Sequence, residues 1–257
     1  MRSVLLVTIG IGALLLMGSA QAAAPLAPSA FNWGSFYVGG HVGYQWTHVE
    51  TNTFDGVGTP IDSTTSDLSG ILGGGQVGYN WVFMPSLLLG VEADISGADI
   101  TGSGSSCIAA GCASHLTKID QLATVRGRLG YLWNDWLLYG TGGWAFSHSS
   151  TDAAVTCVVA GGGSCPGGPS PSSLTGKVAS ASGSQGGWAG GAGFERPLGT
   201  IIPLLPGHWT FKLEYLHTQF DNVVRDFNYP KFPTAFRHDV STSSSDQVRF
   251  GMNYLFN

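Results

Sequence analysis

The final ten residues of the chain, Val248 to Asn257, read Val-Arg-Phe-Gly-Met-Asn-Tyr-Leu-Phe-Asn. Successive side chains of an extended strand point to opposite faces, so one face carries Val248, Phe250, Met252, Tyr254 and Phe256. The other face carries Arg249, Gly251 and Asn253. A soluble sheet buries such an apolar face, whereas a membrane barrel turns it toward lipid. The alternation therefore predicts a strand, and repetition, export and loop length decide between the two environments.

The first 22 residues contain the three regions of a secretory signal peptide. Arg2 supplies a positive charge, an apolar run extends from Val4 to Met17, and Ala20-Gln21-Ala22 forms a small-x-small cleavage site. The apolar run is shorter than the ~20 residues that a transmembrane helix needs. We therefore predict a signal peptide at 1–22 and export of the remaining chain.

The composition of the chain favours strands over helices. It contains 39 Gly, 8 Trp, 8 Tyr and 13 Phe, and only 11% of its residues are charged. Aromatic residues favour strands, and glycine favours turns. Without the signal peptide, 10 basic residues face 16 acidic ones, and no basic cluster occurs. This balance argues against nucleic acid as a partner.

The same alternation recurs along the rest of the exported chain. It predicts strands near 36–48, 69–83, 87–99, 117–133 and 208–221, with charged residues, including Lys118 and Asp120, on the less apolar face. Two further strands are expected near 136–150 and 184–197, where glycines interrupt the pattern and either face of 136–150 could point outward. With the terminal strand, the count is about eight.

The connections between these strands are unequal in length. Short turns are expected at 84–86 and 133–135, and a longer one at 197–207. They alternate with long polar stretches at about 51–68, 100–116, 151–183 and 222–244. Short periplasmic turns and long outer loops are typical of outer-membrane barrels. We therefore predict an all-β, antiparallel up-and-down transmembrane barrel over 34–257, preceded by a short periplasmic segment at 23–33.

Several motifs resemble those of the OmpA-like barrel proteins of alphaproteobacteria, often called outer-membrane immunogenic or porin-family proteins. They are Gly-Ser-Phe-Tyr-Val-Gly-Gly-His-Val-Gly-Tyr at 34–44, Gly-Gly-Gly-Gln-Val-Gly-Tyr-Asn at 73–80, Gly-Val-Glu-Ala-Asp at 90–94, Val-Arg-Gly-Arg-Leu-Gly-Tyr at 125–131, Leu-Tyr-Gly-Thr-Gly-Gly at 138–143, Lys-Leu-Glu-Tyr at 212–215 and the terminal strand. The resemblance covers nearly the whole exported chain in order. It implies an eight-stranded barrel with both termini in the periplasm.

Charged residues on the less apolar faces are expected inside the barrel. They are Glu92, Asp94, Arg126, Arg128, Glu195, Lys212, Glu214 and Arg249. An eight-stranded barrel is only wide enough inside for side chains to fill it. Buried charge without a partner is costly, so we predict that these residues pair into a structural plug. A narrow porin-like solute channel is the alternative.

Four cysteines occupy two of the expected outer loops. Cys107 and Cys112 share one, and Cys157 and Cys165 share the other. An even count in an exported chain predicts disulfides with three possible connectivities, of which we prefer the two local pairs. We expect no metal site, because His115 is the only histidine close to these thiols in the sequence.

One feature supports an enzymatic alternative. His148 and Ser150 lie two residues apart, with Asp152 beyond, in an arrangement that resembles the His-x-Ser of lipid A deacylase barrels. A catalytic serine needs a base within hydrogen-bonding distance. The same residues also read as the start of a serine-rich loop, and we favour a non-enzymatic protein without a cofactor.

The predicted location is the bacterial outer membrane. The expected partners are outer-membrane lipid and lipopolysaccharide around the wall, and the barrel-assembly machinery through the C-terminal strand. Chains of the resembled family usually end on an aromatic residue, whereas here Asn257 follows Phe256. The outer loops are the expected contact surface, and their ligand does not follow from the sequence.

Overall fold

The computed structural model describes residues 31–55, 60–108, 111–156, 179–202, 208–227 and 237–256. The predicted signal peptide and most of the predicted periplasmic segment lie outside the described residues. The elements are β1 (Phe36–Asp55), β2 (Pro60–Met84), β3 (Leu87–Ile108), β4 (Gly111–Trp133), β5 (Trp136–Thr156), β6 (Ala179–Pro197), the 3₁₀ helix η1 (Leu198–Thr200), β7 (Trp209–Phe220), β8 (Val223–Phe227) and β9 (Arg237–Phe256).

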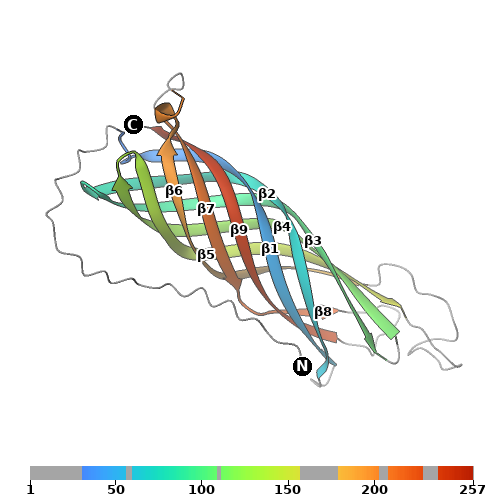
Figure 1. The fold of residues 1–257 in the computed structure, drawn as a ribbon. Coiled ribbons are helices and arrows are strands. Elements are labelled where there is room, and N and C mark those ends of the chain that lie inside the picture. Colours follow the sequence, from blue (N-terminus) through green and yellow to red (C-terminus); the bar gives the residue numbers. More distant parts are fainter. Residues whose placement is uncertain are drawn as a thin grey trace, which may run out of the picture.

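The strands form a closed antiparallel barrel. Each of β1 to β6 pairs with the next strand in sequence, β7 pairs with β9, and β9 pairs with β1 to close the ring (Figure 1). Eight strands make the wall, and the short β8 adds to the outer part of β9. Within the described residues, no helix is long and apolar enough to cross a membrane. The prediction of an up-and-down barrel is confirmed.

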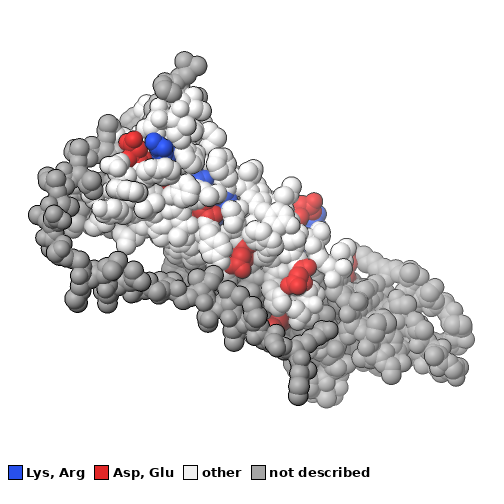
Figure 2. Space-filling view, in the orientation of Figure 1, with Lys and Arg blue, Asp and Glu red and all other residues white. Residues whose placement is uncertain are grey.

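The apolar faces of the strands form the outside of the barrel. Trp144 is 69% exposed, Ile71 67% and Val42 62%, although apolar side chains of this size are normally buried in a soluble protein. Charged side chains are sparse on the wall seen in Figure 2. A continuous apolar exterior suits contact with hydrocarbon. The predicted facing of β1, β2, β3, β7 and β9 is confirmed.

A bulge corrects the predicted facing at the start of β4. The β4–β5 register shifts between Ile119 and Gln121, which changes the face on which the preceding residues lie. Lys118 is therefore about half exposed and contacts Asp99 at 3.7 Å and Asp120 at 3.6 Å. The expectation that Lys118 and Asp120 share the inner face with Arg126 is wrong.

The strands extend well beyond the apolar belt. Much of the stretches expected as loops near 51–68 and 100–116 belongs to β1 to β4, which continue to the ends given above. Outside a membrane both faces of a strand can be polar, so the alternation disappears while the backbone ladder continues. The sequence pattern therefore underestimates these strands.

The wall is less complete in this outer extension. Pairing between β6 and β7 ends at Gly187 and Phe220, whereas pairing between β5 and β6 continues to Ala179. Among the described residues, no ladder joins β6 to β8. A single backbone hydrogen bond, from Asp221 N to Gly186 O at 2.8 Å, spans the end of this seam.

The short turn between β4 and β5 lies at the opposite end of the barrel. Asn134 has a φ of 53°, which is a left-handed conformation that asparagine tolerates better than most residues. Asn134 and Asp135 thus form a two-residue hairpin turn, as the sequence predicts. Because short turns occupy the periplasmic end of outer-membrane barrels, this end is the periplasmic one.

The lumen is filled by layers of different polarity. A periplasmic apolar cluster closes the end of the barrel that carries the Asn134–Asp135 turn, and it consists of Trp33, Tyr37, Leu88, Leu132, Leu137, Tyr139 and Leu255. Two further apolar clusters lie toward the outer end: Leu122, Ala145, Ala189, Leu216 and Phe220 form one, and Leu68, Ile100 and Ile119 form the other. The alternation in the sequence predicts charged residues in the interior but does not reveal these apolar layers. Charged residues occupy the zone between them.

Candidate functional site: the ionic layer of the lumen

The ionic layer is defined by the eight charged residues that the sequence analysis placed inside the barrel. Glu92 and Asp94 come from β3, Arg126 and Arg128 from β4, and Glu195 from β6. Lys212 and Glu214 come from β7, and Arg249 comes from β9. All eight side chains are buried, with exposures of 5% or less. The alternation of each strand points them inward.

Arg126 is the centre of this layer. Its Nη1 donates to Glu214 Oε1 at 2.9 Å, and its Nη2 donates to Glu92 Oε1 at 2.6 Å and to Asp94 Oδ2 at 3.0 Å. Glu92 is on the neighbouring strand, whereas Glu214 is three strands away in the sheet order. One guanidinium therefore joins opposite sides of the wall through charge-assisted hydrogen bonds.

Two further cations also cross the lumen. Lys212 Nζ donates to both oxygens of Glu92 at 3.0 Å, between β7 and β3. Arg249 Nη1 donates to Asp94 Oδ1 at 3.0 Å, between β9 and β3. These strands are not neighbours in the sheet. The contacts therefore fill the width of the barrel.

Two tyrosines connect the ionic layer to the periplasmic apolar cluster. The Tyr37 hydroxyl donates to Glu92 Oε2 at 2.7 Å, and the Tyr139 hydroxyl donates to Glu214 Oε2 at 3.0 Å. The Arg128 guanidinium lies 4.0 Å from the centroid of the Tyr139 ring and donates from Nη2 to Glu195 Oε2 at 2.9 Å. Each tyrosine thus presents its ring to apolar or cationic neighbours and its hydroxyl to a carboxylate.

Neutral polar side chains complete the hydrogen bonding of the acids. Thr210 Oγ1 donates to Glu195 Oε1 at 2.5 Å, and Asn253 Nδ2 donates to the same oxygen at 2.9 Å. Thr124 donates to Asp94. The sequence analysis did not assign these roles, nor that of Tyr139, whose strand is interrupted by glycines. In the sequence, these residues are marked only by their position on the inward-facing side of an alternating strand.

The ionic layer carries no net formal charge. Its four carboxylates, Glu92, Asp94, Glu195 and Glu214, match its four cations, Arg126, Arg128, Lys212 and Arg249. Pairing reduces the large cost of burying each charge, provided that hydrogen bonds satisfy the remaining polar atoms. The arrangement can hold the strands in register and block the lumen.

The structure separates the two residues of the enzymatic alternative. His148 Nδ1 lies 3.1 Å from Ser184 Oγ on β6, and Ser150 Oγ donates to Asp120 Oδ2 at 3.3 Å. Ser150 therefore has a carboxylate partner, and no described contact joins it to His148. Within the described part of the chain, no group of three or more His, Cys, Asp or Glu side chains could hold a metal ion.

The register brings the two cysteines of the first pair together. Cys107 on β3 is the direct cross-strand partner of Cys112 on β4. Opposed residues in an antiparallel pair have Cα atoms about 4.5–5.5 Å apart, which is within the range that disulfides span. Cys157 and Cys165 lie outside the described residues.

We expect a Cys107–Cys112 disulfide in the exported protein. Mass spectrometry of peptides from the unreduced protein should find these two residues linked. After reduction, a membrane-impermeant thiol reagent should label them on intact cells, because they lie on the outer extension. A peptide that joins Cys107 to Cys165 would contradict this pairing.

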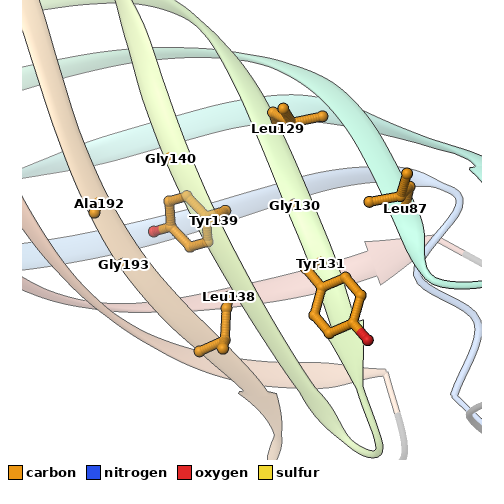
Figure 3. Close-up of a pocket in the computed structure, with 9 residues that line it drawn as sticks. All are labelled: Leu87, Leu129, Gly130, Tyr131, Leu138, Tyr139, Gly140, Ala192 and Gly193. Carbon is orange, nitrogen blue, oxygen red and sulfur yellow. The ribbon is translucent and has the colours of Figure 1, made fainter. Parts of the chain in front are cut away.

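The outer wall carries a shallow apolar depression across β3 to β6 (Figure 3). Gly140 and Ala192 are small outward-facing residues, and the larger side chains of Leu129 and Leu138 also line the depression. Tyr139, between Leu138 and Gly140, is buried and belongs to the lumen. Because it lies within the apolar exterior, the depression is a lipid-contact surface.

Comparison with known proteins agrees with this architecture. The family model described as "Outer membrane protein beta-barrel domain" matches residues 11–256. The chain is 30% identical to the 31 kDa outer-membrane immunogenic protein of Brucella melitensis over the full length of both chains. It is 33% identical to a 22 kDa outer membrane protein of Rhizobium leguminosarum over 48% of this chain and 47% of that one. Its fold is similar to the crystal structure of OprG from Pseudomonas aeruginosa, with a TM-score of 0.50, 13% identity, and coverage of 88% of this chain and 98% of that chain.

Proposed function

Because the chain belongs to the outer-membrane β-barrel domain family and is an outer-membrane protein, we propose that it is a structural, non-conducting barrel whose outer strands and loops form its contact surface. The observation that carries this proposal is the neutral ionic layer. Its cations and carboxylates contact each other across the full width of the lumen. The barrel is then an anchor, and its contacts with lipid are those of the apolar wall.

The layers of buried side chains in the lumen favour a plugged interior rather than an open channel. A water-filled pore leaves its lining side chains hydrated, whereas Arg126, Lys212 and Arg249 are each fully buried. An eight-stranded barrel has little interior volume beyond its side chains. The periplasmic apolar cluster adds a second obstruction, because Trp33 is only 1% exposed among Leu88, Leu137 and Leu255.

The enzymatic alternative has weaker support. Catalysis by Ser150 would need His148 as a base, and Ser150 instead contacts Asp120. A non-enzymatic role is therefore the one that the contacts favour.

The plug predicts that the protein does not conduct ions. The refolded, full-length exported chain should be reconstituted in planar bilayers in concentrated KCl. We expect no steady single-channel current steps. The physical reason is that ions would have to break several buried ion pairs to pass. Heat-modifiable migration in detergent gels should first establish that the sample is folded. Large, stable current steps from such a sample would refute the plug and support the porin alternative.

A further inference from the structure

A groove crosses the outward face of β2, β1 and β9, above the apolar belt. It has a volume of about 260 Å³ and is lined by residues that include Trp46, His48, Asp67 and Asp246. Trp46 is 50% exposed, and the Tyr44 ring packs edge-on against it with ring centroids 5.0 Å apart, so the two rings offer an aromatic surface to a ligand. This groove is separate from the lumen and has no part in the ionic layer.

The strand register places a carboxylate on each side of the indole. Asp246 of β9 is the direct cross-strand partner of Trp46. On the other side, Asp67 of β2 pairs with His48, the next outward residue of β1. Neighbouring strands lie about 4.8 Å apart, so both acids lie within reach of one small group over the ring.

Both carboxylates are held in place by neighbours. Asp67 Oδ1 lies 2.7 Å from His48 Nδ1. Asp246 Oδ1 accepts from the Tyr215 hydroxyl at 2.5 Å and lies 2.8 Å from His217 Nδ1. For each acid, the described contacts use only Oδ1, and the described residues offer no partner to Oδ2. Among the described residues, Oδ2 of each acid therefore has no partner that would compete with a ligand.

The groove lies at the level of lipid headgroups. Directly below it on the same outward faces are Tyr44, Val248 and Ile71, which are exposed members of the apolar belt. Farther from the belt than Trp46, the outward residues are polar, as His48 and Ser244 of the groove itself illustrate. Tryptophans at such a boundary sit among headgroups. The first ligand that this surface meets is therefore a lipid of the outer leaflet.

We propose that this groove binds the ammonium headgroup of an outer-leaflet lipid. A cation over the face of Trp is attracted by the ring, and two flanking carboxylates match its charge. The same carboxylates repel a headgroup whose only charge is a phosphate. The inference needs only a membrane-embedded barrel, and it holds whether or not the lumen conducts.

Fluorine NMR of the refolded full-length exported chain can test the proposal. The protein is labelled with 5-fluorotryptophan and held in maltoside micelles, and the Trp46→Phe variant identifies the Trp46 signal. Titration with dihexanoylphosphatidylcholine should shift this signal saturably, whereas dihexanoylphosphatidylglycerol should not. The double variant Asp67→Asn, Asp246→Asn should weaken the apparent affinity for dihexanoylphosphatidylcholine by about fivefold. This is the effect expected when two solvent-exposed charge contacts are lost.

The matched control is Asp99→Asn. Asp99 is an exposed carboxylate on β3 that contacts Lys118 and does not line the groove. It should leave the titration unchanged. Equal shifts with both lipids, or an unchanged affinity in the double variant, would overturn the proposal. Saturation by free tetramethylammonium at the same concentration would also overturn it, because the ligand would then be a soluble cation.

Discussion

Replacing Arg126 by Met should lower the free energy of unfolding by about 3–5 kcal/mol, the usual cost of leaving buried charges without their partner. The change removes a guanidinium that, alone among the described side chains, contacts Glu92, Asp94 and Glu214 together. These carboxylates are at most 5% exposed, so little solvent is available to compensate for the loss. Urea titration of the protein in lipid vesicles, followed by tryptophan fluorescence and gel migration, measures the effect.

Lys118→Met is the matched control for this variant. Lys118 is also a cation on β4, but it is about half exposed and its contacts with Asp99 and Asp120 are longer. Its loss should cost at most about 1 kcal/mol. Arg126→Lys keeps the positive charge but loses the planar guanidinium that bonds several carboxylates at once. The free energy of unfolding of this variant should therefore lie between those of the wild type and Arg126→Met. Equal costs for Arg126→Met and Lys118→Met would contradict the central role of Arg126.

Replacing Leu213 by Arg should cost about 2–4 kcal/mol, the effect of placing a cation near the middle of the lipid-facing wall. Leu213 lies between Phe194 of β6 and Phe250 of β9 in the register, within the aromatic part of the wall. The same vesicle unfolding assay measures the loss, and slower membrane insertion should accompany it.

Gln219→Arg tests whether depth in the membrane is the cause. Gln219 lies on the same face of the same strand as Leu213, six residues farther toward the outer end, where its partners in the register are Trp188 of β6 and Ser244 of β9 at the edge of the apolar belt. Its substitution should cost about 0–1 kcal/mol, because the cation reaches water. Similar costs at the two positions would mean that the outward facing of β7 is misassigned.

Most of the membrane-spanning wall could be predicted from the sequence, because the facing of each strand follows from the alternation of its own residues. Each lipid-facing residue is two positions from the next, so β7 and β9 could be oriented from their own residues. The outer extensions could not, because their outward faces are polar and their inward faces mix polar residues with a few apolar ones such as Leu68 and Ile100, so the alternation of apolar and polar residues is weak there. The bulge near Ile119 also escaped detection, since an inserted residue changes the face without changing the composition.

The members of the ionic layer could be listed, but their partners could not. Which cation meets Glu214 depends on the closure and stagger of the whole ring, and the contact between β4 and β7 joins residues 88 positions apart. The apolar layers were missed for a related reason. Leu137 and Leu255 are apolar residues on inward faces, and only the closed geometry shows that they are covered by Trp33.

The seam between β6 and β8 gives the two halves of the molecule different ways of coming apart. In the membrane the ladder is a ring without ends, so no strand can fray there unless two neighbouring ladders break together. In the outer extension, the described part of β6 beyond Gly187 has a backbone ladder only with β5, so its pairs there can open one at a time. The extension can therefore lengthen, shorten or change sequence during evolution while the anchoring ring stays closed.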